Sequence, residues 1–161
     1  DAEIAFDDRL RETCAAARAH DQRVTLILVD VIGTREVNEA HGHEAGDAMI
    51  RRAATGVQRS VRAVDFAARI GGDDFGIIIA DGDLELGRRI ARRIAHEIER
   101  SNGEPGSDIP VSVVFGVASG IAPDSAELFA AADQQITQHK RSRSLAVALA
   151  PWEDFDGPSV A

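Results

Sequence analysis

The sequence predicts an α/β domain with a mixed or antiparallel central sheet flanked by helices. Apolar, β-branched runs alternate along the chain with stretches of helical periodicity, which is typical of this class. Two of the runs, Val64–Ile70 and Phe75–Ala80, are separated only by Gly71-Gly72-Asp73-Asp74, a composition that favours a hairpin turn. Because a hairpin joins antiparallel strands, the sheet cannot be wholly parallel. The 161 residues, 44% hydrophobic and 28% charged, suffice for one globular domain.

The first half of the chain alternates helix, strand and helix. Residues 3–20 carry apolar side chains at helical spacing. Val24–Val29 is almost wholly apolar and β-branched, which predicts a strand buried on both faces with Asp30 at its end. Residues 34–60 predict two helices split by His41–Asp47, where two glycines break the pattern. Asp47 is then a candidate N-cap of the second helix.

The second half predicts two helices, a strand between them and a short strand after them. The expected elements are a helix at Leu84–Glu99, a strand at Val111–Ala118, a helix at 125–140 and a strand at Leu145–Leu149. No internal repeat or shift of composition marks a second domain. We therefore expect one domain over residues 1–161, with an N-terminal linker helix (1–21), a catalytic core (22–150) and an irregular tail (151–161).

Charge and cysteine content exclude several classes of function. Lys and Arg total 18 against 27 Asp and Glu, a formal net charge of -9, so a binder of nucleic acid polymers, which needs a basic face, is disfavoured. The single Cys14 allows no internal disulfide and is expected to be a small buried hydrophobe. No apolar run of membrane length and no signal-like start is present, which makes the cytoplasm the expected location.

Three carboxylates are candidates for a metal site. Asp30 ends a strand, and Asp73 with Asp74 occupies the tip of the hairpin, so the three converge if these strands are neighbours. Mg²⁺ prefers oxygen ligands and is commonly held by one or two carboxylates together with substrate phosphates. Glycine and aspartate are also ordinary turn residues, so the hairpin by itself equally fits a structural turn.

Two longer segments connect these acids to a known family. Asn38–Asp47 is similar to the motif N-D-x-x-G-H-x-x-G-D, and Arg69–Phe75 is similar to R-x-G-G-D-E-F. With these matches the chain resembles the GGDEF family of diguanylate cyclases from about Leu26 to Lys140, with Asp74 in place of the signature glutamate. The resemblance implies a palm-like nucleotidyl cyclase fold.

The resemblance also implies a role for each matching residue. Asp30, Asp73 and the carbonyl of Val31 would hold Mg²⁺ or Mn²⁺, and Asp74 would lie near the ribose 3′-hydroxyl of bound GTP or near a metal. Asn38 and Asp47 match the residues that read guanine; their structural alternatives are a helix-surface amide and a helix N-cap. The remaining substrate and phosphate positions are Gly33, Thr34, Arg35, Arg69, Gly71, Gly72 and Lys140. Asp73, Asp74, Arg35 and Lys140 are the expected catalytic set, although Arg35 and Arg69 also fit solvated surface charges.

A second nucleotide site is implied by Arg62-Ala63-Val64-Asp65, which resembles the R-x-x-D site where the family binds its product, cyclic di-GMP. Arg93 falls where a further arginine of that site is found. The fork of an arginine suits a phosphate or a guanine edge. The alternative is a surface ion pair between Arg62 and Asp65.

Besides Asp74, the chain departs from the family pattern in several places, two of them in segments that hold candidate site residues. Asp30-Val31-Ile32-Gly33-Thr34-Arg35 replaces D-x-D-x-F-K, so the second acid and the aromatic residue are gone. Gln134–Lys140 keeps only the lysine of A-L-Y-x-A-K. Both changes affect the expected phosphate side of the site.

The first hypothesis is a homodimeric cyclase that condenses two GTP into cyclic di-GMP and two pyrophosphates, as the cytoplasmic output domain of a longer protein with an upstream sensor domain. The alternative is a degenerate GGDEF domain that binds GTP or cyclic di-GMP as a regulatory module. A third hypothesis, the polymerase palm of a CRISPR effector complex, explains a G-G-D-D tip but not Asn38–Asp47.

Overall fold

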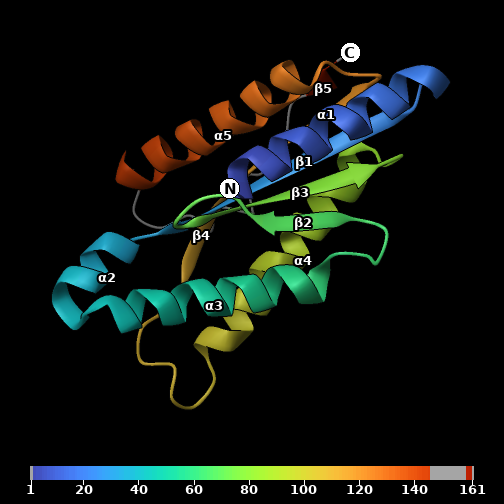
Figure 1. The fold of residues 1–161 in the computed structure, drawn as a ribbon. Coiled ribbons are helices and arrows are strands. Elements are labelled where there is room, and N and C mark those ends of the chain that lie inside the picture. Colours follow the sequence, from blue (N-terminus) through green and yellow to red (C-terminus); the bar gives the residue numbers. More distant parts are fainter. Residues whose placement is uncertain (1, 146–158, 161) are drawn as a thin grey trace.

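The computed structural model describes residues 2–145, 159 and 160, which form one five-stranded sheet with helices on both faces (Figure 1). The strand order is β2-β3-β1-β4-β5. The strands are β1 (Arg23–Ile32), β2 (Phe66–Arg69), β3 (Asp74–Ala80), β4 (Ser112–Ile121) and β5 (Ser159–Val160). The first four are antiparallel to their neighbours, and β5 runs parallel to β4. The predicted mixed or antiparallel sheet is confirmed, and the predicted hairpin, β2–β3, forms one edge of it.

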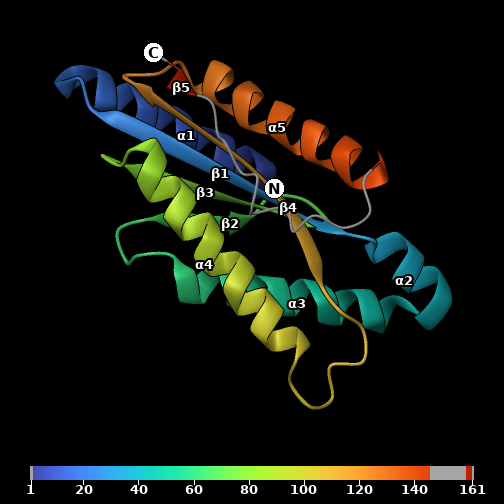
Figure 2. The same cartoon turned by 180° about the vertical axis from the view of Figure 1, so that it is seen from behind.

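The helices divide between the two faces of the sheet. They are α1 (Ala2–His20), α2 (Thr34–His41), α3 (His43–Ser60), α4 (Leu84–Asn102) and α5 (Ser125–Leu145). Figures 1 and 2 show α1 and α5 on one face and α3 and α4 on the other. The two buried clusters divide in the same way, one beneath each pair of helices.

The central strand β1 contributes to both clusters, which explains its continuous apolar run. Ile27 and Val29 pack toward α3 and α4, whereas Leu26 and Leu28 pack toward α1 and α5. Successive side chains of a strand point to opposite faces, so a strand covered on both sides has no polar face. Because both faces of β1 are buried, the strand is held in place, and Asp30 is positioned near its end.

Helix α1 packs on the sheet through one apolar stripe. Phe6, Leu10, Cys14 and Ala17 recur at intervals of four and three residues and are buried. The ring of Phe6 lies over Gly76, where an added Cβ would be 2.6 Å from Phe6 Cε2. Burial raises the pKa of the Cys14 thiol, as expected for a small hydrophobe. The helix expected as an N-terminal linker thus contributes to the core.

One predicted boundary is wrong at the turn between α2 and α3. Asp47 lies inside α3, and the residue before the helix is Gly42 with φ 91°. A positive φ suits glycine, so a single residue reverses the chain and α3 begins at His43, not at Asp47. Asp47 is therefore not an N-cap.

The C-terminal expectations need two corrections. Leu145 ends α5 and so is helical, while the rest of the strand expected at Leu145–Leu149 lies outside the described residues. Within the tail expected to be irregular, Ser159–Val160 pair with Ser119 and Gly120 of β4. A strand of two residues is too short to show a sequence pattern, so β5 could not be predicted from the sequence.

Candidate active site

The three predicted carboxylates come together at one end of the sheet. Asp30 on β1 and Asp74 on β3 are register partners. Asp73 directly precedes β3, and its carbonyl accepts a hydrogen bond of 2.8 Å from the backbone N–H of Val31. The hairpin tip is thus fastened to β1 beside Asp30. The convergence predicted from the sequence is confirmed.

Lys140 joins this cluster from α5, and its ammonium forms an ion pair with the carboxylate of Asp30. Burial raises the pKa of Asp30, the hydrogen bond and charge of Lys140 lower it, and the charges of Asp73 and Asp133 raise it. The hydrogen bond to Asp30 raises the pKa of Lys140. One cation is therefore held inside a group of acids.

Asp74 is repelled by the charges of three neighbouring acids. Burial raises its pKa first, and the charges of Asp30, Asp73 and Glu3 raise it further, while Lys140 lowers it. Such a partly buried group of carboxylates has an excess of negative charge beside Lys140. A bound cation would relieve that repulsion.

The residues fit a metal that shares its ligands with a substrate. In the described part of the chain, no group of three or more His, Cys, Asp or Glu side chains has the arrangement of a complete metal site. Asp30 and Asp73 nevertheless supply carboxylate oxygens, the donors that Mg²⁺ prefers, and phosphates commonly complete its coordination. The fit is therefore to Mg²⁺ bound together with a nucleotide rather than to a closed structural site.

The tip of the hairpin is held by Arg69. Its Nε donates to the carbonyl of Gly71 at 3.1 Å and its Nη2 donates to the carbonyl of Gly72 at 2.5 Å. The hydroxyl of Thr34 lies 3.5 Å from Asp73 Oδ2, which connects the start of α2 to the hairpin. These contacts give Arg69 a positioning role at the tip. Gly33, directly before Thr34, is the residue that precedes α2.

Arg35 is not brought to the acids by any contact within the described residues. Its Nε lies 3.3 Å from Glu39 Oε1, one turn further along α2, and both side chains are largely exposed. An exposed ion pair of this kind is weak. The arginine can therefore exchange Glu39 for another anion at little cost.

Asn38 carries an unused acceptor between α2 and α3. Its side-chain Oδ1 is buried and has no hydrogen-bond partner among the described residues. The amide lies against Gly46, where an added Cβ would be 2.7 Å from Asn38 Cγ. Asp47 follows Gly46 on α3 and is exposed. A buried acceptor without a donor is costly, so this amide is a candidate for ligand recognition.

Arg62 and Asp65 form a close ion pair after α3. Asp65 Oδ1 lies 2.8 Å from Arg62 Nη2, and Asp65 Oδ2 also accepts a hydrogen bond of 2.8 Å from the backbone N–H of Arg62. The Asp65 side chain is 0% exposed and that of Arg62 is 39% exposed. The hydrogen bond to Asp65 raises the pKa of Arg62. This is the ion pair that the structural alternative expected, with part of the guanidinium still open to solvent.

Arg93 lies on the exposed side of α4, which packs beside α3. Arg59 near the end of α3 is 3.7 Å from Glu97 of α4. Because Arg93 precedes Glu97 by about one turn, and Arg62 follows the end of α3, the two arginines belong to the same end of this helix pair.

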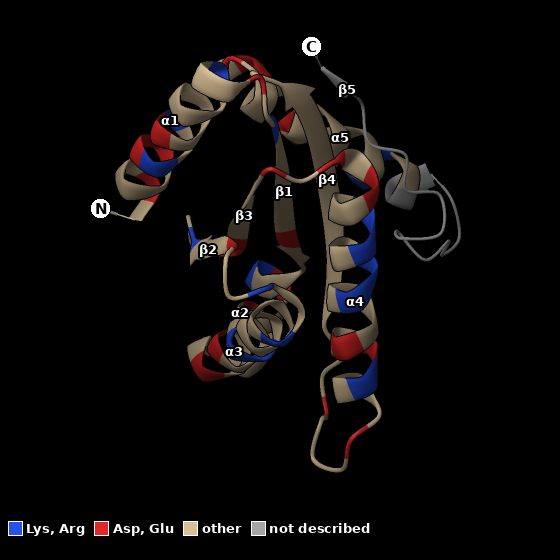
Figure 3. Cartoon of the chain, turned by 90° about the vertical axis from the view of Figure 1, so that its right-hand side faces the viewer, with Lys and Arg blue, Asp and Glu red and all other residues tan. Residues whose placement is uncertain are grey.

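Several other arginines of α4 lie beside acids. Arg88 and Arg92 lie 3.9 Å and 3.6 Å from Glu85. Figure 3 shows acidic and basic residues sharing the same helix. Because acids are interspersed with the arginines, this surface is not a basic patch for a nucleic acid polymer.

Two acids near the site were missed by sequence reasoning. Glu3 from α1 and Asp133 from α5 raise the pKa of Asp74 and Asp30, respectively. Neither residue belongs to a recognised motif. The available signal was their position on the same helices as Phe6 and Lys140. That position shows which way the acids point only once both helices are placed on the sheet.

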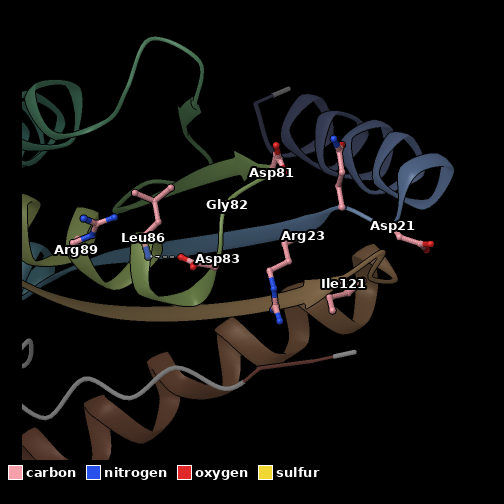
Figure 4. Close-up of a pocket in the computed structure, with 9 residues that line it drawn as sticks. Asp21, Arg23, Asp81, Gly82, Asp83, Leu86, Arg89 and Ile121 are labelled. Carbon is pink, nitrogen blue, oxygen red and sulfur yellow. Dashed lines mark hydrogen bonds between the residues drawn. The ribbon is translucent and has the colours of Figure 1, made fainter.

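A cavity of about 510 Å³ lies at the opposite end of the strands (Figure 4). It is lined by residues such as Arg23, Asp81 and Arg89, and none of the predicted site residues contributes to it. Asp83 in its wall is engaged as the cap of α4, accepting from the backbone N–H of Leu86 at 2.9 Å. The acid cluster, not this cavity, is the candidate site. Within the described residues, no helix has both the length and the hydropathy needed to cross a bilayer.

The palm-like sheet with an acidic hairpin defines a nucleotidyl cyclase class of fold, and comparison with known proteins specifies the family. The family model "Diguanylate cyclase, GGDEF domain" matches residues 3–144. The chain therefore belongs to the GGDEF domain family of diguanylate cyclases, as its motifs predicted.

Curated relatives and solved structures agree with this assignment. The chain is 28% identical over 135 residues to the probable diguanylate cyclase DgcT of Escherichia coli strain K12, a match covering 81% of this chain and 30% of DgcT. It is 30% identical over 129 residues to the response regulator PleD of Caulobacter vibrioides, covering 77% and 28% of the two chains. The chain thus spans less than a third of these curated relatives.

Two solved structures show how closely the fold is shared. The GGDEF domain of DgcB from Caulobacter crescentus, crystallised in complex with c-di-GMP, has a TM-score of 0.80 and 26% identity, with 87% of this chain and 85% of that chain covered. The GGDEF domain of PA1120 (YfiN or TpbB) from Pseudomonas aeruginosa has a TM-score of 0.76 and 26% identity, with coverages of 86% and 89%. The domain fold is therefore that of these GGDEF domains.

Proposed function

We propose that this domain is a diguanylate cyclase that condenses two GTP into cyclic di-GMP and two pyrophosphates as a homodimer. The observation that carries the proposal is the convergence of Asp30, Asp73 and Asp74 at the tip of the hairpin, with Lys140 paired to Asp30. Each domain would hold one GTP, and the 3′-hydroxyl of each nucleotide would attack the α-phosphate of the other. The reaction therefore needs two facing domains.

Asp30, Asp73 and the carbonyl of Val31 would hold Mg²⁺ or Mn²⁺. When bound, the cation supplies electrostatic stabilisation of the charge that develops on the reacting phosphate. The raised pKa values of Asp30 and Asp74 support this assignment, because both groups would gain from a nearby positive charge. Lys140 would contribute a fixed cation to the triphosphate, and Arg35 would leave its exposed partner Glu39 to contact a phosphate.

Asp74 would orient the attacking 3′-hydroxyl or assist at the metal. An aspartate keeps the charge of the family's glutamate and is one methylene shorter. Its raised pKa makes it a better proton acceptor than a solvent-exposed aspartate. Catalysis would otherwise come mainly from positioning and electrostatics, as is typical of phosphoryl transfer.

Guanine would be read between α2 and α3. The buried, unpartnered Oδ1 of Asn38 supports this, because guanine offers ring and amino N–H donors that such an acceptor needs. The exposed carboxylate of Asp47 would accept the remaining N–H groups. Gly33 and Thr34 would line the phosphates, while Arg69 would hold Gly71 and Gly72 in place beneath them.

Arg62, Asp65 and Arg93 would form a product-binding site that inhibits the domain. The partly exposed guanidinium of Arg62 and its position at the Arg93 end of α4 support this. This domain would be the cytoplasmic output domain of a longer protein with an upstream sensor domain. The length of the relatives, more than three times that of the matched segment, supports a longer protein.

The alternative is a regulatory module that binds GTP or cyclic di-GMP without converting it. The substitution of Asp74 for glutamate and the missing acid and aromatic residue at Ile32–Thr34 favour this second candidate. Both candidates share the nucleotide site and differ only in turnover.

The test is incubation of purified domain at high concentration with GTP and Mg²⁺ or Mn²⁺, followed by chromatography and mass spectrometry of the nucleotides. The cyclase proposal predicts cyclic di-GMP from the wild type and none from Asp73→Ala. Absence of product in a sample that is dimeric by ultracentrifugation would refute the cyclase. Direct titration with GTP and with cyclic di-GMP would then decide whether the regulatory module is correct.

A further inference from the structure

The outer edge of β4 is completed by side chains of α5 rather than by a strand along most of its length. Among the described residues, β5 pairs with β4 at Ser119 and Gly120. Further along the same edge, the backbone N–H of Val117 donates to Gln135 Oε1 at 2.9 Å. The carbonyl of Phe115 lies 2.7 Å from His139 Nδ1. Because a carbonyl only accepts, Nδ1 of His139 is the protonated nitrogen.

These two bonds form one structural unit, which we call the α5 clasp (Gln135 and His139). The two side chains are four residues apart and lie on the same face of the helix. The two backbone groups are two residues apart on the strand and point to the same edge. Gln135 is only 7% exposed, so this bond is shielded from solvent. The clasp therefore sets the register of α5 on β4.

The approach of helix and strand at the clasp is close. An added Cβ on Gly116, between the two bonded residues, would be 2.9 Å from the carbonyl carbon of Ala132 and 3.1 Å from Ile136 Cγ1. The absence of a side chain at Gly116 lets the helix backbone come near enough for both bonds. The resulting position of α5 has little freedom to slide.

The clasp is directly connected to the cation of the site. Lys140 follows His139, and its ammonium pairs with Asp30. Asp30 is the register partner of Val114 on β4, the residue beside Phe115. The bond at His139 is thus one residue from Lys140 on the helix and one residue from the partner of Asp30 on the strand.

We propose that Gln135 and His139 are positioning residues that hold Lys140 over Asp30, and with it over the triphosphate. Both stand where the family motif A-L-Y-x-A-K has alanine, so the device belongs to this chain. The positioning of Lys140 is a property of the nucleotide-free domain, and only its consequence for GTP rests on the proposed function.

Lys140 is the one lysine of the sequence, which makes the first test direct. In protein labelled with ¹³C-lysine, the Cε group gives a single NMR signal, and a held side chain has two inequivalent Hε protons at constant pH. We expect this inequivalence in the wild type and its collapse in Gln135→Ala and His139→Ala. His139→Asn and Gln135→Glu, which keep a donor and an acceptor in place, should restore it. Gln134→Ala and Gln138→Ala are matched controls, since both glutamines are exposed on the same helix.

The second test measures the affinity for 3′-deoxy-GTP, which binds but lacks the attacking hydroxyl. In protein that keeps Lys140, each clasp variant should raise the Kd about three- to tenfold. In protein that carries Lys140→Met, the same variants should leave the Kd unchanged, which is the coupling expected when the clasp acts through Lys140. Unchanged Hε signals in folded clasp variants would overturn the proposal, as would equal losses of affinity in both backgrounds. If the signals collapse as expected but the wild type itself binds no nucleotide, the proposed function fails while the positioning role stands.

Discussion

Replacing Gly46 by alanine should damage guanine recognition without unfolding the domain. The new Cβ would lie 2.7 Å from Asn38 Cγ and 2.9 Å from Asn38 Nδ2, where ordinary contacts begin at 3.4 Å. The nearest atom to the new Cβ is Asn38 Oδ1, with which it would overlap, so the amide must retreat by more than roughly 0.7 Å. A hydrogen bond of about 2.9 Å is then stretched beyond about 3.6 Å, too long to count as one. Loss of one such bond costs about 1–1.5 kcal/mol, a five- to tenfold rise in Kd.

The stability of the Gly46→Ala variant should change little. Alanine in a helix gains roughly 0.5–1 kcal/mol over glycine, which offsets part of the strain from the displaced amide. The matched control is Gly103→Ala, because the added Cβ there would be 3.6 Å from the carbonyl of Arg100 and the backbone is already right-handed helical.

The assay is calorimetric titration with 3′-deoxy-GTP and Mg²⁺, accompanied by thermal unfolding. We expect a higher Kd for Gly46→Ala and an unchanged Kd for Gly103→Ala. The Tm of both variants should stay near that of the wild type. Equal affinity of Gly46→Ala and wild type would refute the assignment of Asn38 as a guanine contact.

Three further predictions concern the acids, the α1 contact and the product site. Since the pKa of Asp74 is raised, its ionisation destabilises the fold as the pH rises from the ordinary value of 3.8 through the folded-state pKa. Asp74→Asn should therefore raise the Tm at pH 7 in EDTA by a few degrees while lowering product formation, and an unchanged or lower Tm would contradict the repulsion. Phe6→Ala should lower the free energy of unfolding by about 3–5 kcal/mol in urea denaturation, because the buried ring covers Gly76; a loss below about 1 kcal/mol would contradict this packing. Arg62→Ala should abolish inhibition by added cyclic di-GMP with initial rates preserved, whereas inhibition equal to wild type would remove Arg62 from the product site.

Sequence reasoning was most successful where local chemistry determines structure. The apolar run Val24–Val29 could only be a strand covered on both faces, and Gly71–Asp74 could only be a tight turn. They placed Asp30 and Asp74 at strand ends, and the structure adds that these two strands are neighbours. The local pattern therefore predicted both the sheet and its acidic end.

Sequence reasoning failed where tertiary contacts decide. Gly42 reverses the chain within one residue, so Asp47 became part of a helix instead of its cap. The pairing of Lys140 with Asp30 and the approach of Glu3 to Asp74 depend on where α5 and α1 lie on the sheet. Helical periodicity predicts which face of a helix is buried, but not which residues that face contacts. Gln135 and His139 depart from the motif, but that departure alone does not indicate that they bind the edge of β4.

The central claim is that two domains complete one reaction, and the dependence of rate on concentration tests it most directly. Initial rates of cyclic di-GMP formation from GTP and Mg²⁺ should be measured over a wide range of domain concentrations, with Asp73→Ala as the inactive control. The account predicts a rate per domain that rises with concentration, in step with the dimer fraction from ultracentrifugation. No cyclic di-GMP at any concentration, or a rate per domain that stays constant while the domain is monomeric, would contradict it.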